Sequence, residues 1–131
     1  MSNKVFQYYQ PNKKDLKDTK GDCVIRALTK VLNKDWFNIF DDLIPYAKAN
    51  QCMPNDKDVL KDYLLTQDFK YVGVSNKKGT VRPTVESFTK QHKTGTYILI
   101  VAHHVVASID GHYYDTWDSG CKSLYGYWEK I

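Results

Sequence analysis

The chain has 131 residues, of which 42% are apolar and 26% charged. This size and composition indicate one globular domain and exclude a disordered chain, a collagen-like repeat and a coiled coil. The mean hydropathy is −0.55 and no apolar run approaches the roughly 20 residues of a membrane span. The net charge of +4 is mild, and Arg26 and Arg82 are the only arginines. This pattern disfavours nucleic acid as a partner, because readers of bases and phosphates favour arginine.

The first half of the chain is expected to be helical after an irregular start. Residues 1–20 are polar and show no periodic apolar pattern, and their first part has no apolar signal core, so we expect a cytoplasmic protein. Apolar residues at helical spacing then predict a helix over 23–33 and two more before residue 67. Pro45 is expected to kink or end the second of these. The expected N-caps of the three helices are Asp22, Asp35 and Asn55.

The second half is expected to be mostly β-structure. A strand is predicted at 69–74, followed by a short helix that Thr84 caps and that stops by Gly95. Further strands are predicted at 96–102, 104–109, 112–117 and 124–128. Asp110-Gly111 is a strong two-residue hairpin turn. Helices followed by an antiparallel sheet indicate an α+β domain, which we expect to comprise residues 1–131.

The three cysteines, Cys23, Cys52 and Cys121, are widely spaced and form no CxxC pair. This spacing excludes a zinc ribbon and argues against a disulfide framework. Cys23 lies in the first turn of the first predicted helix, where free backbone N–H groups and the helix dipole favour a thiolate. The adjacent Asp22 opposes this by like charge, so its carboxylate must point away or be neutralised. Cys52 and Cys121 lie in predicted loops without such a setting.

The predicted hairpin places a histidine beside a carboxylate. With a turn at Asp110-Gly111, His104, Asp115 and Trp117 fall on one face, and Asp115 is a diagonal neighbour of His104. Asp118 has the wrong parity unless a bulge intervenes, and His103 points to the opposite face. A metal site that combines Cys23 with the histidines is therefore disfavoured, and we expect no metal and no cofactor.

Cys23, His104 and Asp115 have the residue types and the order of a catalytic triad, in which the carboxylate orients the imidazole and the imidazole pairs with the thiolate. Trp117 would shield the bond between His104 and Asp115 from water. These residues resemble the papain-like cysteine peptidase superfamily, in which a Cys begins a helix, a His begins a strand and an Asn or Asp follows on the next strand. The segment Asp115-Thr116-Trp117 resembles its Asn-Ser-Trp signature.

The short length resembles the compact bacterial and phage branch, such as bacteriocin-leader-processing peptidases. The resemblance implies a papain-like fold, with the catalytic Cys at the start of the first of several N-terminal helices that pack on a C-terminal antiparallel sheet. It also implies a cysteine hydrolase that works through a thioester acyl-enzyme on a peptide or protein substrate, in the cytoplasm of a bacterium or a phage-infected host cell.

The chain departs from the family at the oxyanion-binding glutamine, which normally precedes the Cys by about six residues and is Lys17 here. The expected sources of the side-chain donor are Asn12, Lys17, Thr19 and Lys20, beside the Cys23 N–H. Asp118 remains a second candidate for the third triad position.

A peptidase is our first expectation. An amidase, a deamidase or an acyl transferase would use the same triad, and a binding protein of the same fold would use none. The substrate and the oligomeric state stay open.

Overall fold

A mixed sheet of six strands forms the centre of the computed structural model, which describes residues 4–75 and 77–131. The strands are β1 (Phe6–Tyr8), β2 (Phe69–Gly73), β3 (Thr96–Val101), β4 (His104–Ile109), β5 (His112–Asp115) and β6 (Gly126–Lys130). The helices are α1 (Cys23–Leu32), α2 (Trp36–Asn50), α3 (Lys57–Thr66) and α4 (Val85–Gln91). The domain is therefore α+β, as the sequence predicts.

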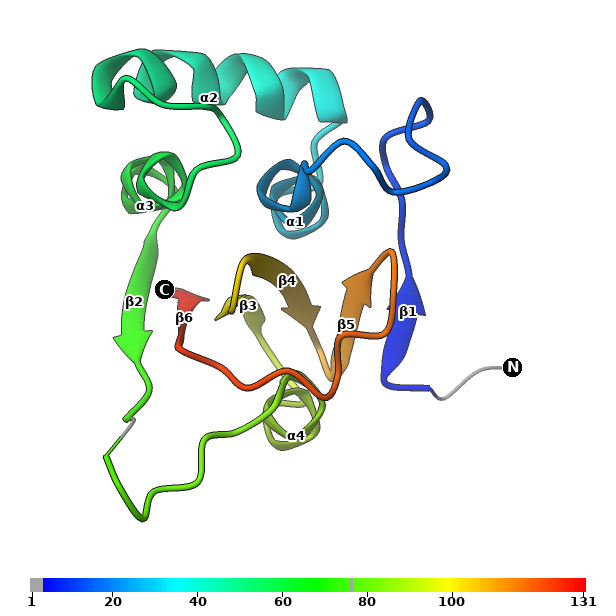
Figure 1. Cartoon of the computed structure of the whole chain (residues 1–131), viewed down its shortest axis with the longest axis vertical. Helices are drawn as coiled ribbons and strands as arrows, with labels where there is room; N and C mark the ends of the chain where they lie inside the picture. The colour runs from blue at the N-terminus through cyan, green and yellow to red at the C-terminus, as the bar shows by residue number, and fades with distance from the viewer. Residues whose placement is uncertain (1–3, 76) are drawn as a thin grey trace.

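The strand order across the sheet is β1-β5-β4-β3-β6-β2. Helices α1, α2 and α3 lie on one side of the sheet and α4 lies on the other (Figure 1). Both faces of the central strands are consequently buried, which explains why β3 is a continuous apolar run. Along β3, Ile98 and Ile100 belong to the core under α1–α3, whereas Leu99 and Val101 belong to the core around α4.

Two expectations about the sheet are wrong. Residues 1–20 are not wholly irregular, because β1 pairs in parallel with β5; residues 1–3 lie outside the described residues. The sheet is therefore mixed and not purely antiparallel, and it is not confined to the C-terminal part, since β1 forms one of its edges. A three-residue edge strand has too few side chains to produce an alternation that a sequence pattern would reveal.

The helix boundaries differ from the sequence expectation in three places. Pro45 lies inside α2, so of the two expected effects, a kink or an end, it does not end the helix. Asp56, and not Asn55, caps α3, with its side chain accepting from the Asp58 N–H. Helix α4 ends at Gln91 with His92 as its C-cap, before Gly95, where the sequence places its stop. Within residues 4–75 and 77–131, none of the helices combines the length and hydropathy needed to cross a bilayer.

Candidate active site

The start of helix α1 and the start of strand β4 meet at one point of the molecule. Cys23 is the first residue of α1, and α1 packs against β4. His104 is the first residue of β4 and is buried. The thiol of Cys23 is half-buried, and the imidazole of His104 and the backbone N–H of Val105 both act on it and lower its pKa. Two segments that are 81 positions apart in the chain are thus joined at the cysteine sulfur.

His104 is held from its other side by a carboxylate. Its Nε2 lies 2.6 Å from Oδ2 of Asp115, which leaves Nδ1 for the Cys23 sulfur. Asp115 is only 3% exposed. Its Oδ2 also accepts the Ser119 hydroxyl at 2.7 Å, and its Oδ1 accepts the Thr116 N–H at 2.8 Å. These bonds fix the carboxylate, and through it they fix the orientation and tautomer of the imidazole.

The electrostatics of the pair favour a thiolate next to an imidazolium. Burial alone raises the pKa of the Cys23 thiol, but the hydrogen bond and charge of His104, together with Asn55 and the Val105 N–H, lower it below its usual value. Burial lowers the pKa of His104, whereas Asp115 and the Cys23 sulfur raise it more, to about 9. Each partner stabilises the charged form of the other, which is the arrangement of an activated cysteine.

Asn55 is a site residue that the sequence analysis missed. Its Oδ1 accepts the backbone N–H of Val24 at 2.8 Å, so its Nδ2 faces the Cys23 sulfur, 3.7 Å away. The sequence suggested only a helix cap here, and Asp56 takes that role. No local signal would have found the contact, because Asn55 lies 31 positions from Val24 and meets it only in the folded chain.

Arg26 is the second residue that the sequence analysis missed. This buried guanidinium bonds Asp22 at 2.6 Å and Asp18 at 3.0 Å, and it lies 3.7 Å from Asp115. It therefore neutralises Asp22, whose charge would otherwise oppose a thiolate at Cys23. Asp22 occupies the N-cap position of α1 but its side chain makes no capping bond. The i,i+4 spacing of Asp22 and Arg26 was a signal that could have suggested this pair.

Trp117 and Asp118 have different surroundings. The ring of Trp117 lies 5.1 Å from that of His104 between centroids and is tilted by 34°, and it covers the imidazole although it is 39% exposed. Asp118 accepts hydrogen bonds from the Tyr113 hydroxyl and from the Gly120 N–H. Asp118 is therefore occupied in the loop after β5, and the carboxylate beside His104 belongs to Asp115.

The four expected oxyanion donors upstream of Cys23 are engaged elsewhere or lie at the surface. The hydroxyl of Thr19 donates to the buried carboxylate of Asp15 at 3.2 Å, and the side chain of Lys20 is exposed. The amide of Asn12 donates to Asp22, and Lys17 is exposed. The groups that act on the Cys23 sulfur are His104, Asn55 and Val105, so the structure places none of the four against it.

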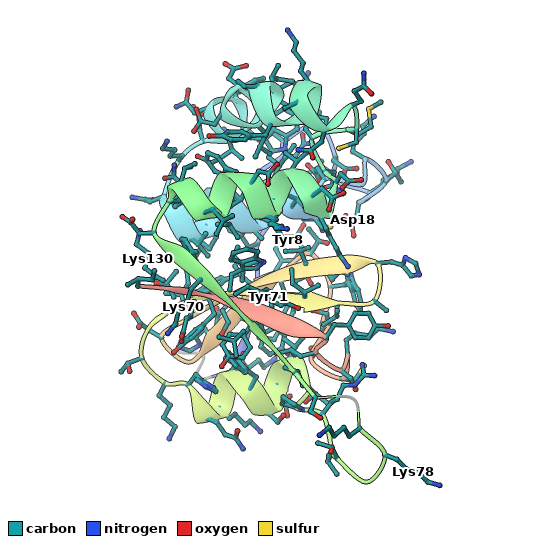
Figure 2. The ribbon with its side chains drawn as sticks, turned by 90° about the vertical axis from the view of Figure 1, so that its left-hand side faces the viewer. Tyr8, Asp18, Lys70, Tyr71, Lys78 and Lys130 are labelled. Atoms are coloured by element: carbon teal, nitrogen blue, oxygen red, sulfur yellow. The ribbon has the colours of Figure 1, made fainter. Side chains whose placement is uncertain are left out.

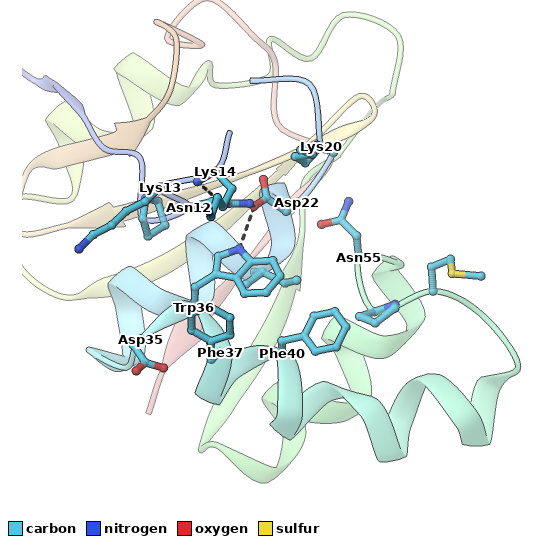
Figure 3. Close-up of a pocket in the computed structure, with 15 residues that line it drawn as sticks. Asn12, Lys13, Lys14, Lys20, Asp22, Asp35, Trp36, Phe37, Phe40 and Asn55 are labelled. Carbon is cyan, nitrogen blue, oxygen red and sulfur yellow. Dashed lines mark hydrogen bonds between the residues drawn. The ribbon is translucent and has the colours of Figure 1, made fainter. Parts of the chain in front are cut away.

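A pocket of about 870 Å³ lies beside the segment that leads into Cys23, although Cys23 itself does not line it (Figure 3). The residues before Cys23, the start of α2 and the segment before α3 line it, and Asn55 belongs to both the pocket and the cysteine site. As for metals, the residues that the structure describes include no group of three or more His, Cys, Asp or Glu that could hold an ion.

Comparison with protein-family models, with curated proteins and with solved structures found no match to this chain. The functional assignment therefore depends on the chemistry of the site.

Proposed function

We propose that the protein is a cysteine hydrolase of papain-like type, and in the first place a peptidase, with Cys23 as nucleophile. The observation that carries the proposal is the continuous chain from Asp115 through the buried His104 to the Cys23 sulfur at a helix start. A solvated surface histidine would not show this combination of burial, a carboxylate at 2.6 Å and a raised pKa. Strongly perturbed, mutually paired titratable groups are typical of functional sites.

In the first step, the Cys23 thiolate attacks the carbonyl carbon of the scissile amide. The C–S bond forms and the π electrons move to the oxygen, which becomes an oxyanion. When the tetrahedral species collapses, the C–N bond breaks and His104 gives its proton to the departing nitrogen. The products are a free amine and a thioester on Cys23.

In the second step, a water molecule attacks the thioester while the now neutral His104 takes its proton. The C–S bond breaks, the carboxylic acid leaves and the thiolate–imidazolium pair is restored. Asp115 keeps the imidazole in the tautomer that allows both transfers.

The oxyanion needs donors, and two groups beside the sulfur suit this role. The backbone N–H of Cys23 lies in the first turn of α1, where helix N–H groups have no intrahelical acceptor. The Nδ2 of Asn55 lies 3.7 Å from the sulfur, and the oxyanion would be two covalent bonds from that sulfur, within reach of the amide. Asn55 thus takes the place that the family gives to an upstream glutamine.

The direct test is exposure of the protein to a mixed peptide library, with cleavage read by mass spectrometry. We expect cleavage by the wild type and by Cys52→Ala, and none by Cys23→Ala, whose circular dichroism should stay native. The rate should fall as the pH rises through about 9, because His104 then loses the proton that the leaving nitrogen requires. Cleavage that persists in Cys23→Ala would overturn the proposal. An uncut library, together with no acylation of Cys23 by p-nitrophenyl acetate, would overturn it as well.

A further inference from the structure

The pocket beside Cys23 has a preformed aromatic wall. Trp36 is fixed by its Nε1, which donates to Asp22 at 2.8 Å. Phe40 stacks on Trp36 with ring centroids 5.3 Å apart and an interplanar angle of 15°. Phe37 contacts Trp36 edge-on, with ring centroids 5.6 Å apart. Ile25, Met53 and Pro54 complete the apolar lining. The volume of about 870 Å³ lies within the range of pockets that hold whole small ligands, so it has room for more than one side chain.

The apolar lining continues onto the surface. Phe37 is 74% exposed and Met53 is 75% exposed. Both border the same pocket, so two exposed apolar side chains lie at its rim. Large apolar side chains left in water next to a hollow mark a place where an apolar partner binds.

The polar edge of the pocket is basic. Lys13, Lys14 and Lys20 are exposed at the lining. Lys20 lies near the buried Asp15 and helps to lower the pKa of that carboxyl, whereas no ion pair of Lys13 or Lys14 is found among the described residues. Two carboxylates also line the pocket. Asp22 is paired with Arg26, and Asp35 accepts the Asn38 N–H at the start of α2. Three lysines outnumber these two carboxylates at the lining, so the edge is net positive, and Figure 3 shows Lys14 and Lys20 on the side of the pocket opposite Phe40.

The chemistry of the site decides which half of a substrate would enter. His104 must give its proton to the leaving nitrogen, so the leaving group faces His104. The pocket is lined by Gly21 and Asp22, which precede Cys23, and by Asn55, whose Nδ2 lies 3.7 Å from the sulfur. Cys23 itself, His104, Asp115 and Trp117 are not among its lining residues. The pocket therefore lies next to the cysteine on the side of Asn55, and we assign the acyl part of the substrate to it because the leaving group faces His104.

We propose that this pocket selects the acyl side of a peptide substrate, taking an aromatic or large aliphatic side chain against Trp36 and Phe40 and an acidic neighbour at the lysine edge. The proposal rests on the proposed function of Cys23. It specifies a substrate class, namely peptides with an acidic residue next to an apolar one just before the scissile bond.

The test uses p-nitrophenyl esters, because the burst of p-nitrophenolate reports acylation and peptide mass spectrometry locates the acyl group. The esters carry N-acetyl-Gly, N-acetyl-Phe, N-acetyl-Glu-Phe or N-acetyl-Lys-Phe as the acyl part. We expect the Phe ester to acylate Cys23 at least about tenfold faster than the Gly ester, a discrimination that apolar pockets commonly reach. The Glu-Phe ester should react faster than the Lys-Phe ester, and high salt should reduce this difference.

Variants connect the preference to the pocket. Phe37→Ala should bring the Phe and Gly rates together, whereas Leu65→Ala, which truncates an exposed apolar residue of α3, should not. The double substitution Lys13→Glu with Lys14→Glu should reverse the preference for Glu-Phe over Lys-Phe. The same change at Lys78, which lies in the loop at the tip of the molecule (Figure 2), and at its chain neighbour Lys77 should leave the preference intact.

The outcomes separate the two proposals. If Cys23 is acylated but all esters react alike, or the pocket variants keep the wild-type preference, the pocket proposal is wrong and the nucleophile stands. If no ester acylates Cys23 faster than Cys52 and Cys121, the proposed function is wrong and the pocket proposal fails with it.

Discussion

Two cysteines of this chain lie at opposite ends of helices, and their surroundings act on the thiols in opposite directions. Cys23 begins α1, whereas Cys52 follows the C-terminal end of α2, where its N–H bonds the Ala47 carbonyl. Both are half-buried. Burial raises the pKa of Cys52, and the carboxylates of Asp56, Asp58 and Asp62 raise it further. At Cys23 burial has the same effect, but His104 and Asn55 outweigh it.

The comparison shows that burial does not decide whether a cysteine is reactive. The helix end sets the sign of the local dipole, and the partners at the sulfur determine whether a charge can be held there. Cys23 has an imidazole, an amide and a backbone N–H, whereas Cys52 faces carboxylates. Each of the following changes should remove or reduce one of these differences.

The largest effect is expected from Asn55→Ala, measured on acylation of Cys23 by p-nitrophenyl acetate. Loss of the amide removes one oxyanion donor, so the rate should fall about 10²- to 10³-fold. Alkylation of Cys23 by iodoacetamide forms no oxyanion and should change by less than about tenfold. Asn55→Asp keeps an acceptor for the Val24 N–H but lacks the Nδ2 donor. Acylation of Cys23 in this variant should therefore stay low. Equal losses in both reactions would show that Asn55 only supports the thiolate.

His104→Ala should make Cys23 resemble Cys52. Without the imidazole, burial dominates and the pKa of the Cys23 thiol rises, so less thiolate exists at acidic pH. We expect iodoacetamide alkylation of Cys23 at pH 6 to fall about 100-fold, since each unit of pKa above the working pH removes a factor of about ten of thiolate. The matched control is His103→Ala, next to it and exposed, which should react as the wild type does. Unchanged reactivity in His104→Ala would contradict the thiolate–imidazolium pair.

Arg26→Met should place an uncompensated carboxylate next to Cys23. Asp22 and Asp115 would lose their buried cation, and removing one partner of a buried pair typically costs about 3–5 kcal/mol of unfolding free energy. Without Arg26, the charge of Asp22 should also raise the pKa of the Cys23 thiol. Alkylation of Cys23 at pH 6 should therefore fall about tenfold. Urea unfolding and alkylation of Arg82→Met provide the control, because Arg82 lies over the ring of Tyr125 at the surface. If Arg26→Met and Arg82→Met have the same free energy of unfolding, the buried network around Arg26 contributes little to stability.

The smallest effect is expected at the other cysteine. Asp58→Asn removes one of the carboxylates that raise the pKa of Cys52, but Asp58 is exposed and its field is screened. Alkylation of Cys52 at pH 8 should therefore rise by only about two- to threefold, with Cys23 unchanged. Asp41→Asn, another exposed carboxylate, should alter neither cysteine. A decrease at Cys52 would contradict the role of these carboxylates.

Much of the fold and half of the candidate site could be predicted because they depend on local pattern. The apolar spacing after Asp22 places Cys23 at a helix start, and α1 begins there. The Asp110-Gly111 turn sets the register in which Ile109 pairs with His112. That register brings His104 to Asp115 across only 11 positions. Side chains on neighbouring strands of a tight hairpin have few alternatives, since the turn fixes their pairing.

What the sequence by itself determined was therefore the helix that presents Cys23 and the hairpin that joins His104 to Asp115. Tertiary structure alone decided that these two elements meet, that Asn55 lies at the sulfur and that Arg26 is shared by Asp18, Asp22 and Asp115. It also added β1 to the sheet edge. The physical reason is that these contacts join residues far apart in the chain. They depend on how α1 packs on β4 and on where the segment before α3 lies. Burial and packing between the elements, and not the local sequence, determine both positions.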